Sequence, residues 1–129
     1  MREIKFRGRG AYQISVWYIG NLVRYDDGRL TIRENEANEF YVDPKTVGQY
    51  TGLLDSNGRE IYEGDVLNNL YGHLSVSYKQ EWAAFVACGV DSTGYYHEYL
   101  LDEIVNTPVR RSEIKVIGNI HDDPGLLEG

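Results

Sequence analysis

The sequence predicts an all-β protein built either as a small barrel, of which SH3-like barrels are one form, or as curved packed antiparallel sheets. Short apolar runs rich in β-branched and aromatic residues recur along the chain, and turns containing Gly with Asn or Asp separate them. No segment sustains a helical period, so at most short helical turns are expected. Without helices to cover them, the strands must pack against one another.

The first half of the chain contains a predicted hairpin. Residues 3–7 alternate apolar and charged side chains, which predicts a strand with one buried face that ends at the following glycines. Val16–Val23, interrupted at Gly20-Asn21, turns through Asp26-Asp27-Gly28 into a strand at residues 30–32. This pattern is typical of an antiparallel hairpin.

The Asp43-Pro44 dipeptide stops the next predicted strand, Phe40–Val42, because proline cannot donate to a strand ladder. The same residues could open a helical turn, with Asp43 as its cap and Pro44 in the first position. Both interpretations stay open.

Residues 47–67 read as strand, tight turn, strand, tight turn, with turns at Asp55–Gly58 and at Gly64-Asp65. Leu74, Val76 and Tyr78 then alternate with serines in a further strand.

Trp82–Val90 is the most apolar segment and is expected to be a strand buried on both faces, or a short buried helix. Cys88, the only cysteine, is expected in this core. Turn residues 91–94 lead into a strand at residues 95–100.

The C-terminal part predicts a helical turn at residues 101–105 and a last strand at residues 114–118. Asp122-Asp123 before Pro124 is expected to cap a short turn through Leu127.

A chain of 129 residues and 14.8 kDa has the size of one domain, so residues 1–129 are treated as a unit. A division near Lys45 into an N-terminal hairpin region (1–46) and a barrel-like region (47–129) is the alternative. No apolar run is long enough to cross a membrane, no signal peptide opens the sequence, and one cysteine cannot form an intrachain disulfide. The expected location is the cytoplasm.

Charge and motif spacing favour no particular chemistry. The net charge of −7 disfavours a broad nucleic-acid footprint, although residues 1–9 are locally basic. The three histidines do not have the spacing of metal ligands. His97 and Glu98 point to opposite faces of the predicted strand, so they cannot form a general-base pair. The sequence contains no phosphate-binding loop and no nucleophile elbow. No cofactor and no catalytic residue are therefore nominated. His121-Asp122-Asp123 is the one local set that could hold a metal.

Tyrosine is the best candidate for a binding residue, since the chain has 11 of them. Tyrosine adds apolar contact area at low entropic cost and is enriched at recognition surfaces, but it also favours strands in general. The candidate interaction surface consists of five residues of the second half: Tyr71, Tyr78, Tyr95, Tyr96 and Tyr99.

Three blocks, MREIKFRG at the N-terminus, VGQYTGLLDSNGREIYEGDVL at residues 47–67 and EIKVIGNIHDDPGLLE at residues 113–128, resemble the YopX family of phage and prophage proteins. The resemblance implies a mostly β fold and a phage or prophage origin in a bacterial cytoplasm. It implies no activity, because that family has no established biochemical function. The chain departs from the family pattern at His121-Asp122-Asp123 and Gly125.

Three functions remain open from the sequence. The leading hypothesis is a non-catalytic accessory protein that binds an unknown host or phage protein and self-associates. The second is a regulator that binds single-stranded nucleic acid through its basic N-terminal strand and aromatic side chains. The third is a hydrolase or nuclease that uses a metal held by Asp122, Asp123 and a histidine.

Overall fold

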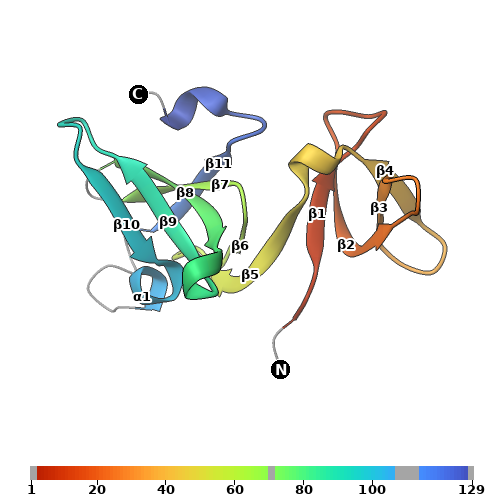
Figure 1. Ribbon diagram of the computed structural model, residues 1–129, viewed down its shortest axis with the longest axis horizontal. Coiled ribbons are helices and arrows are strands. Elements are labelled where there is room, and N and C mark those ends of the chain that lie inside the picture. The colour runs from red at the N-terminus through yellow and green to blue at the C-terminus, as the bar shows by residue number, and fades with distance from the viewer. Residues whose placement is uncertain (1–2, 70–71, 107–113, 128–129) are drawn as a thin grey trace. The chain divides into compact units, whose positions relative to one another are not determined.

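The computed structural model describes residues 3–69, 72–106 and 114–127 and confirms the mostly β fold (Figure 1). The chain divides into two compact units, Met1–Tyr50 and Thr51–Gly129. Within the described residues neither sheet closes into a barrel. Of the two architectures that the sequence allows, the structure therefore has curved antiparallel sheets.

Unit 1 is an antiparallel meander of four strands: β1 (Phe6–Arg9), β2 (Trp17–Arg24), β3 (Leu30–Arg33) and β4 (Glu39–Val42). The first residues of β5 (Gly48–Leu54) pair with the other edge of β1. The meander curls back on itself, because Val42 forms a bridge with Gly10 and the Asp43 amide donates to the Arg9 carbonyl at 2.8 Å.

The predicted hairpin is confirmed as β2 and β3, but the predicted interruption at Gly20-Asn21 is wrong. β2 runs through both residues, and Asn21 pairs with Arg33. Glycine is needed at position 20 because a Cβ there would lie 2.2 Å from the Arg33 carbonyl oxygen. The glycine therefore permits close approach of two strands instead of ending one.

The core of unit 1 lies on one face of this meander. Leu30, Ile32 and Val42 are buried, and Tyr18 stacks on Phe40 with ring centroids 4.1 Å apart. Both interpretations of the segment after Val42 hold, because β4 ends there and a 3₁₀ turn follows at residues 44–46. The Asp43 carboxylate caps that turn by accepting the Lys45 amide at 3.1 Å.

Unit 2 contains β6 (Glu60–Tyr62), which lies beside the later part of β5, and a five-stranded sheet in the order β10-β9-β8-β7-β11. The strands of this sheet are β7 (Asp65–Asn69), β8 (Gly72–Lys79), β9 (Ala84–Val90), β10 (Tyr96–Leu100) and β11 (Lys115–Asn119). The predicted helical turn is confirmed as α1 (Leu101–Asn106), which buries its apolar side chains in the core. That core includes Ile61, Leu67 and Leu101, all fully buried.

Three hairpins share one turn geometry, at residues 25–29, 55–59 and 91–95. In each turn the first residue's amide donates to the fifth residue's carbonyl, at 2.8–3.0 Å, and the glycine amide donates back to the first carbonyl at 3.0 Å. The glycines have φ of +90°, +80° and +89°, the left-handed region that glycine adopts without strain. The predicted turns at Asp26–Gly28, Asp55–Gly58 and residues 91–94 are thus confirmed.

The expectation for Trp82–Val90 is wrong in part. Trp82 ends a short 3₁₀ turn (Gln80–Trp82), Ala83 has a positive φ of 49°, and β9 begins only at Ala84. Within β9 only Val86 and Ala87 are buried, and Cys88 is half-buried. An unbroken apolar run does not reveal which of its residues reach solvent, because hydropathy alone does not place the sheet's covering layer.

Candidate functional site

The strands β8, β9 and β10 lie side by side in unit 2 and present two different faces (Figure 1). Residues paired directly across neighbouring strands share a face. Val76, Ala87 and Tyr99 are aligned in this way on the face that packs into the core. Glu98 and Cys88 are aligned on the opposite face, which we call the outer face.

The outer face carries a connected set of aromatic and charged side chains. The Lys79 ammonium is bonded to the Glu98 carboxylate and lies 4.0 Å from the centroid of the Trp82 ring. The Tyr96 hydroxyl donates to the other Glu98 oxygen at 2.7 Å. Trp82, Tyr96 and Val90 are 48%, 55% and 60% exposed. The face thus joins an ion pair to exposed apolar side chains.

Glu98 links the charges of this face. The Lys79 ammonium, followed by the Tyr96 hydroxyl, lowers the pKa of Glu98 because both stabilise its anion. The same carboxylate raises the pKa of Tyr96, because ionisation of the phenol would break that hydrogen bond and place two negative charges side by side. Glu98 therefore stays anionic and Tyr96 stays a neutral donor at neutral pH.

A second cluster centres on His97. Its Nε2 lies 2.8 Å from Asp91 Oδ2, and its Nδ1 lies 2.9 Å from the Tyr99 hydroxyl. The other Asp91 oxygen accepts the amides of Thr93 and Tyr95 and the Thr93 hydroxyl. Asp91 thus fixes both the turn and the histidine ring. The Thr93 hydrogen bond, followed by the His97 contact, holds the pKa of Asp91 well below its usual range.

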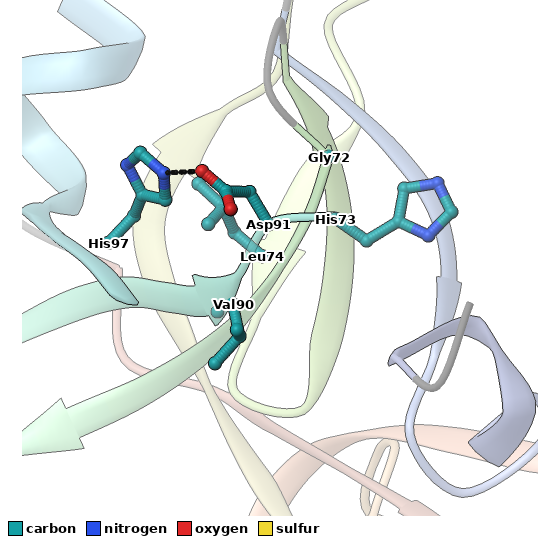
Figure 2. A pocket seen from close by; sticks show the side chains of 7 residues that line it. Gly72, His73, Leu74, Val90, Asp91 and His97 are labelled. Atoms are coloured by element: carbon teal, nitrogen blue, oxygen red, sulfur yellow. Dashed lines mark hydrogen bonds and ion pairs between the residues drawn. The ribbon is translucent and has the colours of Figure 1, made fainter. Parts of the chain in front are cut away.

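Figure 2 shows the pocket beside this cluster, with Asp91 and His97 joined and His73 pointing the other way. His73 Nδ1 lies 2.7 Å from the Leu126 carbonyl oxygen, so the two histidines do not converge. The pocket is a shallow depression without enclosed room for even a water molecule, whereas ligand sites usually enclose roughly 300 Å³ or more. It is lined by Gly72, His73, Leu74, Gly89, Val90, Asp91 and His97. Its size does not favour a small-molecule site.

The four predicted tyrosines within the described residues lie on different sides of unit 2. Tyr96 lies on the outer face, whereas Tyr78 lies on the core side, where it contacts the edge of Phe85 and is still 49% exposed. Tyr95 packs edge-on against His97, with centroids 5.3 Å apart, and Tyr99 packs against the core. Tyr71 lies outside the described residues.

The acidic pair of the C-terminal block bonds to Asn119. The Asn119 amide nitrogen donates to Asp122 at 3.1 Å, and the Asn119 main-chain amide donates to Asp123 at 3.3 Å. The expected short turn forms at residues 124–127, although both carboxylates reach back to Asn119. In the described part of the chain, no group of three or more His, Cys, Asp or Glu side chains is placed to hold a metal.

Two arrangements escaped the sequence analysis. The sequence places Glu98 next to His97, whereas the acidic partner of His97 is Asp91, across the hairpin turn. The second is an arginine–tyrosine cluster in unit 1, where the Arg29 guanidinium carbon lies 5.1 Å from the Tyr41 ring centroid and 5.9 Å from that of Tyr25. The register of β3 with β4 pairs Thr31 with Tyr41 and so brings Tyr41 close to Arg29, two residues before Thr31. That register, if known, would predict the contact between Arg29 and Tyr41.

The described residues contain no helix that is both long and apolar enough to cross a membrane. The helices present are α1 and single turns, the longest of which is far shorter than the roughly 20 residues that a crossing needs.

Fold and surface together define a β protein of two compact units, each with its own hydrophobic cluster and one of them with an aromatic and charged sheet face. Residues 12–128 match the YopX protein family, to which the chain belongs. The fold is similar to the crystal structure of protein EF1440 from Enterococcus faecalis, with a TM-score of 0.54 and 21% identity over 98% of this chain and 99% of that one. No curated protein matches.

Proposed function

We propose that this YopX-family chain is a non-catalytic protein-binding module, an accessory protein of phage or prophage origin that works in the bacterial cytoplasm. Its partner is a host or phage protein, and the outer face of β8–β10 is the binding surface. This proposal selects Tyr96 from the tyrosines predicted by the sequence and adds Trp82 and Val90.

The observation that carries the proposal is the exposure of Trp82, Val90 and Tyr96. Val90 and Tyr96 lie on β9 and β10, and Trp82 lies in the 3₁₀ turn between β8 and β9. Trp and Tyr dominate the binding energy of protein interfaces, because a rigid ring covers a large area at little entropic cost. The sheet and the turn that joins β8 to β9 hold these rings in place before binding, which reduces the ordering cost of association. Small-molecule turnover has weaker support, since the pocket beside His97 is small.

Self-association belongs to the same proposal. β10 is the terminal strand of the five-stranded order, and a terminal strand can pair with the same strand of a second copy. Light scattering of the purified protein over a range of concentrations would measure it.

Affinity capture tests the proposed surface. The immobilised protein is exposed to lysates of host cells and of phage-infected cells, with and without nuclease, beside a Tyr96→Ser variant. A matched control is Tyr12→Ser, which removes an 85% exposed tyrosine from unit 1. We expect the wild type and Y12S to retain the same nuclease-resistant protein and Y96S to lose most of it.

Two results would contradict the proposal. Retention that nuclease abolishes would favour the nucleic-acid function instead. If Y96S and a double variant that also carries Val90→Ser both retained the protein as well as the wild type does, binding would use another surface.

A further inference from the structure

The net charge of the chain is concentrated in unit 2. Residues 1–50 contain 8 Lys or Arg and 7 Asp or Glu, whereas residues 51–129 contain 5 and 13. Unit 1 is therefore close to neutral at +1, and unit 2 carries −8. A field of this sign attracts cationic segments and repels phosphate backbones.

The outer face already holds one cation. The Lys79 ammonium is bonded to Glu98 and lies over the Trp82 ring, so a carboxylate and an aromatic face act on it together. This is the environment in which proteins bind ammonium and guanidinium groups, because ring quadrupole and carboxylate charge both favour a cation. Glu81, in the same turn as Trp82, is exposed and adds a second carboxylate to this end of the sheet.

The position is accessible to a partner. The Lys79 and Glu98 side chains are 29% and 19% exposed, and the Trp82 and Tyr96 rings extend into solvent. Solvent still reaches both side chains of this partly buried ion pair, so solvent and salt screen part of its attraction, and holding the lysine side chain costs entropy. An incoming cation can therefore replace the Lys79 ammonium at small cost.

We propose that the outer face recognises a Lys- or Arg-containing segment of its protein partner, and that Lys79 fills the cation position until that segment binds. The partner's ammonium or guanidinium group pairs with Glu98 beside the Trp82 and Tyr96 rings. This inference rests on the proposed function and names the chemistry of the partner. Lys79 acts as an internal competitor.

Tryptophan fluorescence tests the inference on the full chain. Trp17 and Trp82 are the two tryptophans, so Trp17→Phe leaves Trp82 as the reporter. The probes are synthetic hexalysine and hexaglutamate peptides, titrated at low salt and again at 0.5 M salt. We expect hexalysine to change the emission of Trp82 with an affinity that falls as salt rises, and hexaglutamate to have no effect.

Substitutions at the ion pair give the decisive comparison. Lys79→Met keeps the length of the side chain and removes its charge, so hexalysine should bind several-fold more tightly. Glu98→Gln should weaken binding several-fold, and the double variant should bind no better than E98Q. Glu34→Gln, which removes an exposed charge from unit 1, is the matched control and should leave the affinity unchanged. Circular dichroism confirms that each variant is folded.

Unchanged or weaker hexalysine binding by K79M would overturn the inference, as would equal effects of E98Q and E34Q. Capture from lysate separates this failure from failure of the proposed function. A partner lost with Y96S but retained equally by E98Q and at 0.5 M salt would leave the binding surface standing and remove its cation preference.

Discussion

The carboxylate of Asp55 is buried in the β5–β6 hairpin, where it is only 3% exposed. One oxygen accepts the amides of Asn57 and Arg59, at 2.8 and 2.9 Å, and the other accepts the Val116 amide at 2.9 Å. The first pair fixes the turn, and the third bond fixes β11 against it. Asp65 is also buried and accepts the Tyr62 amide at 2.8 Å. Both aspartates of the segment at residues 47–67 thus have structural roles.

Asp55→Ala is expected to destabilise the protein strongly. The substitution leaves the buried Val116 amide without its acceptor, which costs about 1–3 kcal/mol, and it also removes two bonds from the turn. Urea unfolding monitored by circular dichroism measures the change. Asp27→Ala is the control, because Asp27 stabilises a turn of the same geometry through the Arg29 amide but is exposed. An equal loss in D27A and D55A would contradict the role given to the Val116 bond.

For individual residues, the sequence predicts local contacts but not contacts between distant parts of the chain. The turn at Asp55–Gly58 could be predicted, because glycine and Asx residues specify it locally. The contact from Asp55 to Val116 spans 61 positions and depends on β11 lying beside β7. A single sequence does not contain that information. The same holds for Lys79 and Glu98, which meet only because β8 and β10 flank β9.

At the scale of elements, the sequence predicts hairpins well and the faces of strands poorly. Gly-containing turns fix where a strand reverses, and alternation fixes which residues share a side. Alternation does not reveal which side is covered. Tyr96 and Tyr99 therefore looked like neighbours on one surface, whereas an odd separation along β10 sends them to opposite faces.

The β3–β4 pair carries a carboxylate that responds to pH. Glu39 accepts hydrogen bonds from the hydroxyls of Thr31 and Tyr25 and from Arg33. These partners, in that order, lower the pKa of Glu39 from 4.5 to about 2. The folded state stabilises the Glu39 anion more than the unfolded state does, so the ionised Glu39 carboxylate makes its full contribution to stability above pH 4.5. It is lost as the pH falls toward 2.

We expect the melting temperature to fall between pH 5 and pH 2, and Glu39→Gln to reduce that fall. Thermal unfolding followed by circular dichroism at several pH values measures it. The matched control is Glu36→Gln, an exposed residue of the β3–β4 loop, which should keep the wild-type profile. Identical pH profiles for E39Q and E36Q would refute the assignment.

At the scale of the whole molecule, each unit has its own buried cluster and one tryptophan, Trp17 in unit 1 and Trp82 in unit 2. The sequence favours one domain of 129 residues, and unfolding of the two units as one domain stays a prediction. The placement of the tryptophans makes it measurable, because replacing either one with Phe leaves a reporter of the other unit.

Leu67→Ala removes a fully buried side chain from unit 2 and should cost about 2–5 kcal/mol there. In urea, the transition reported by Trp82 in the W17F background should move to lower concentration by more than the transition reported by Trp17 in the W82F background. Equal shifts of the two transitions would mean that the chain unfolds as one cooperative unit.

The position of β11 in its sheet has a consequence for synthesis on the ribosome. β7, β8, β9 and β10 each pair with the strand before or after them, so this meander can form while the chain is still emerging. β11 pairs with β7, about fifty residues earlier, and supplies the Val116 amide to Asp55. Until residues 115–119 leave the exit tunnel, the nascent chain exposes an unpaired β7 edge, which is a site where strands of other chains can pair and aggregation can begin.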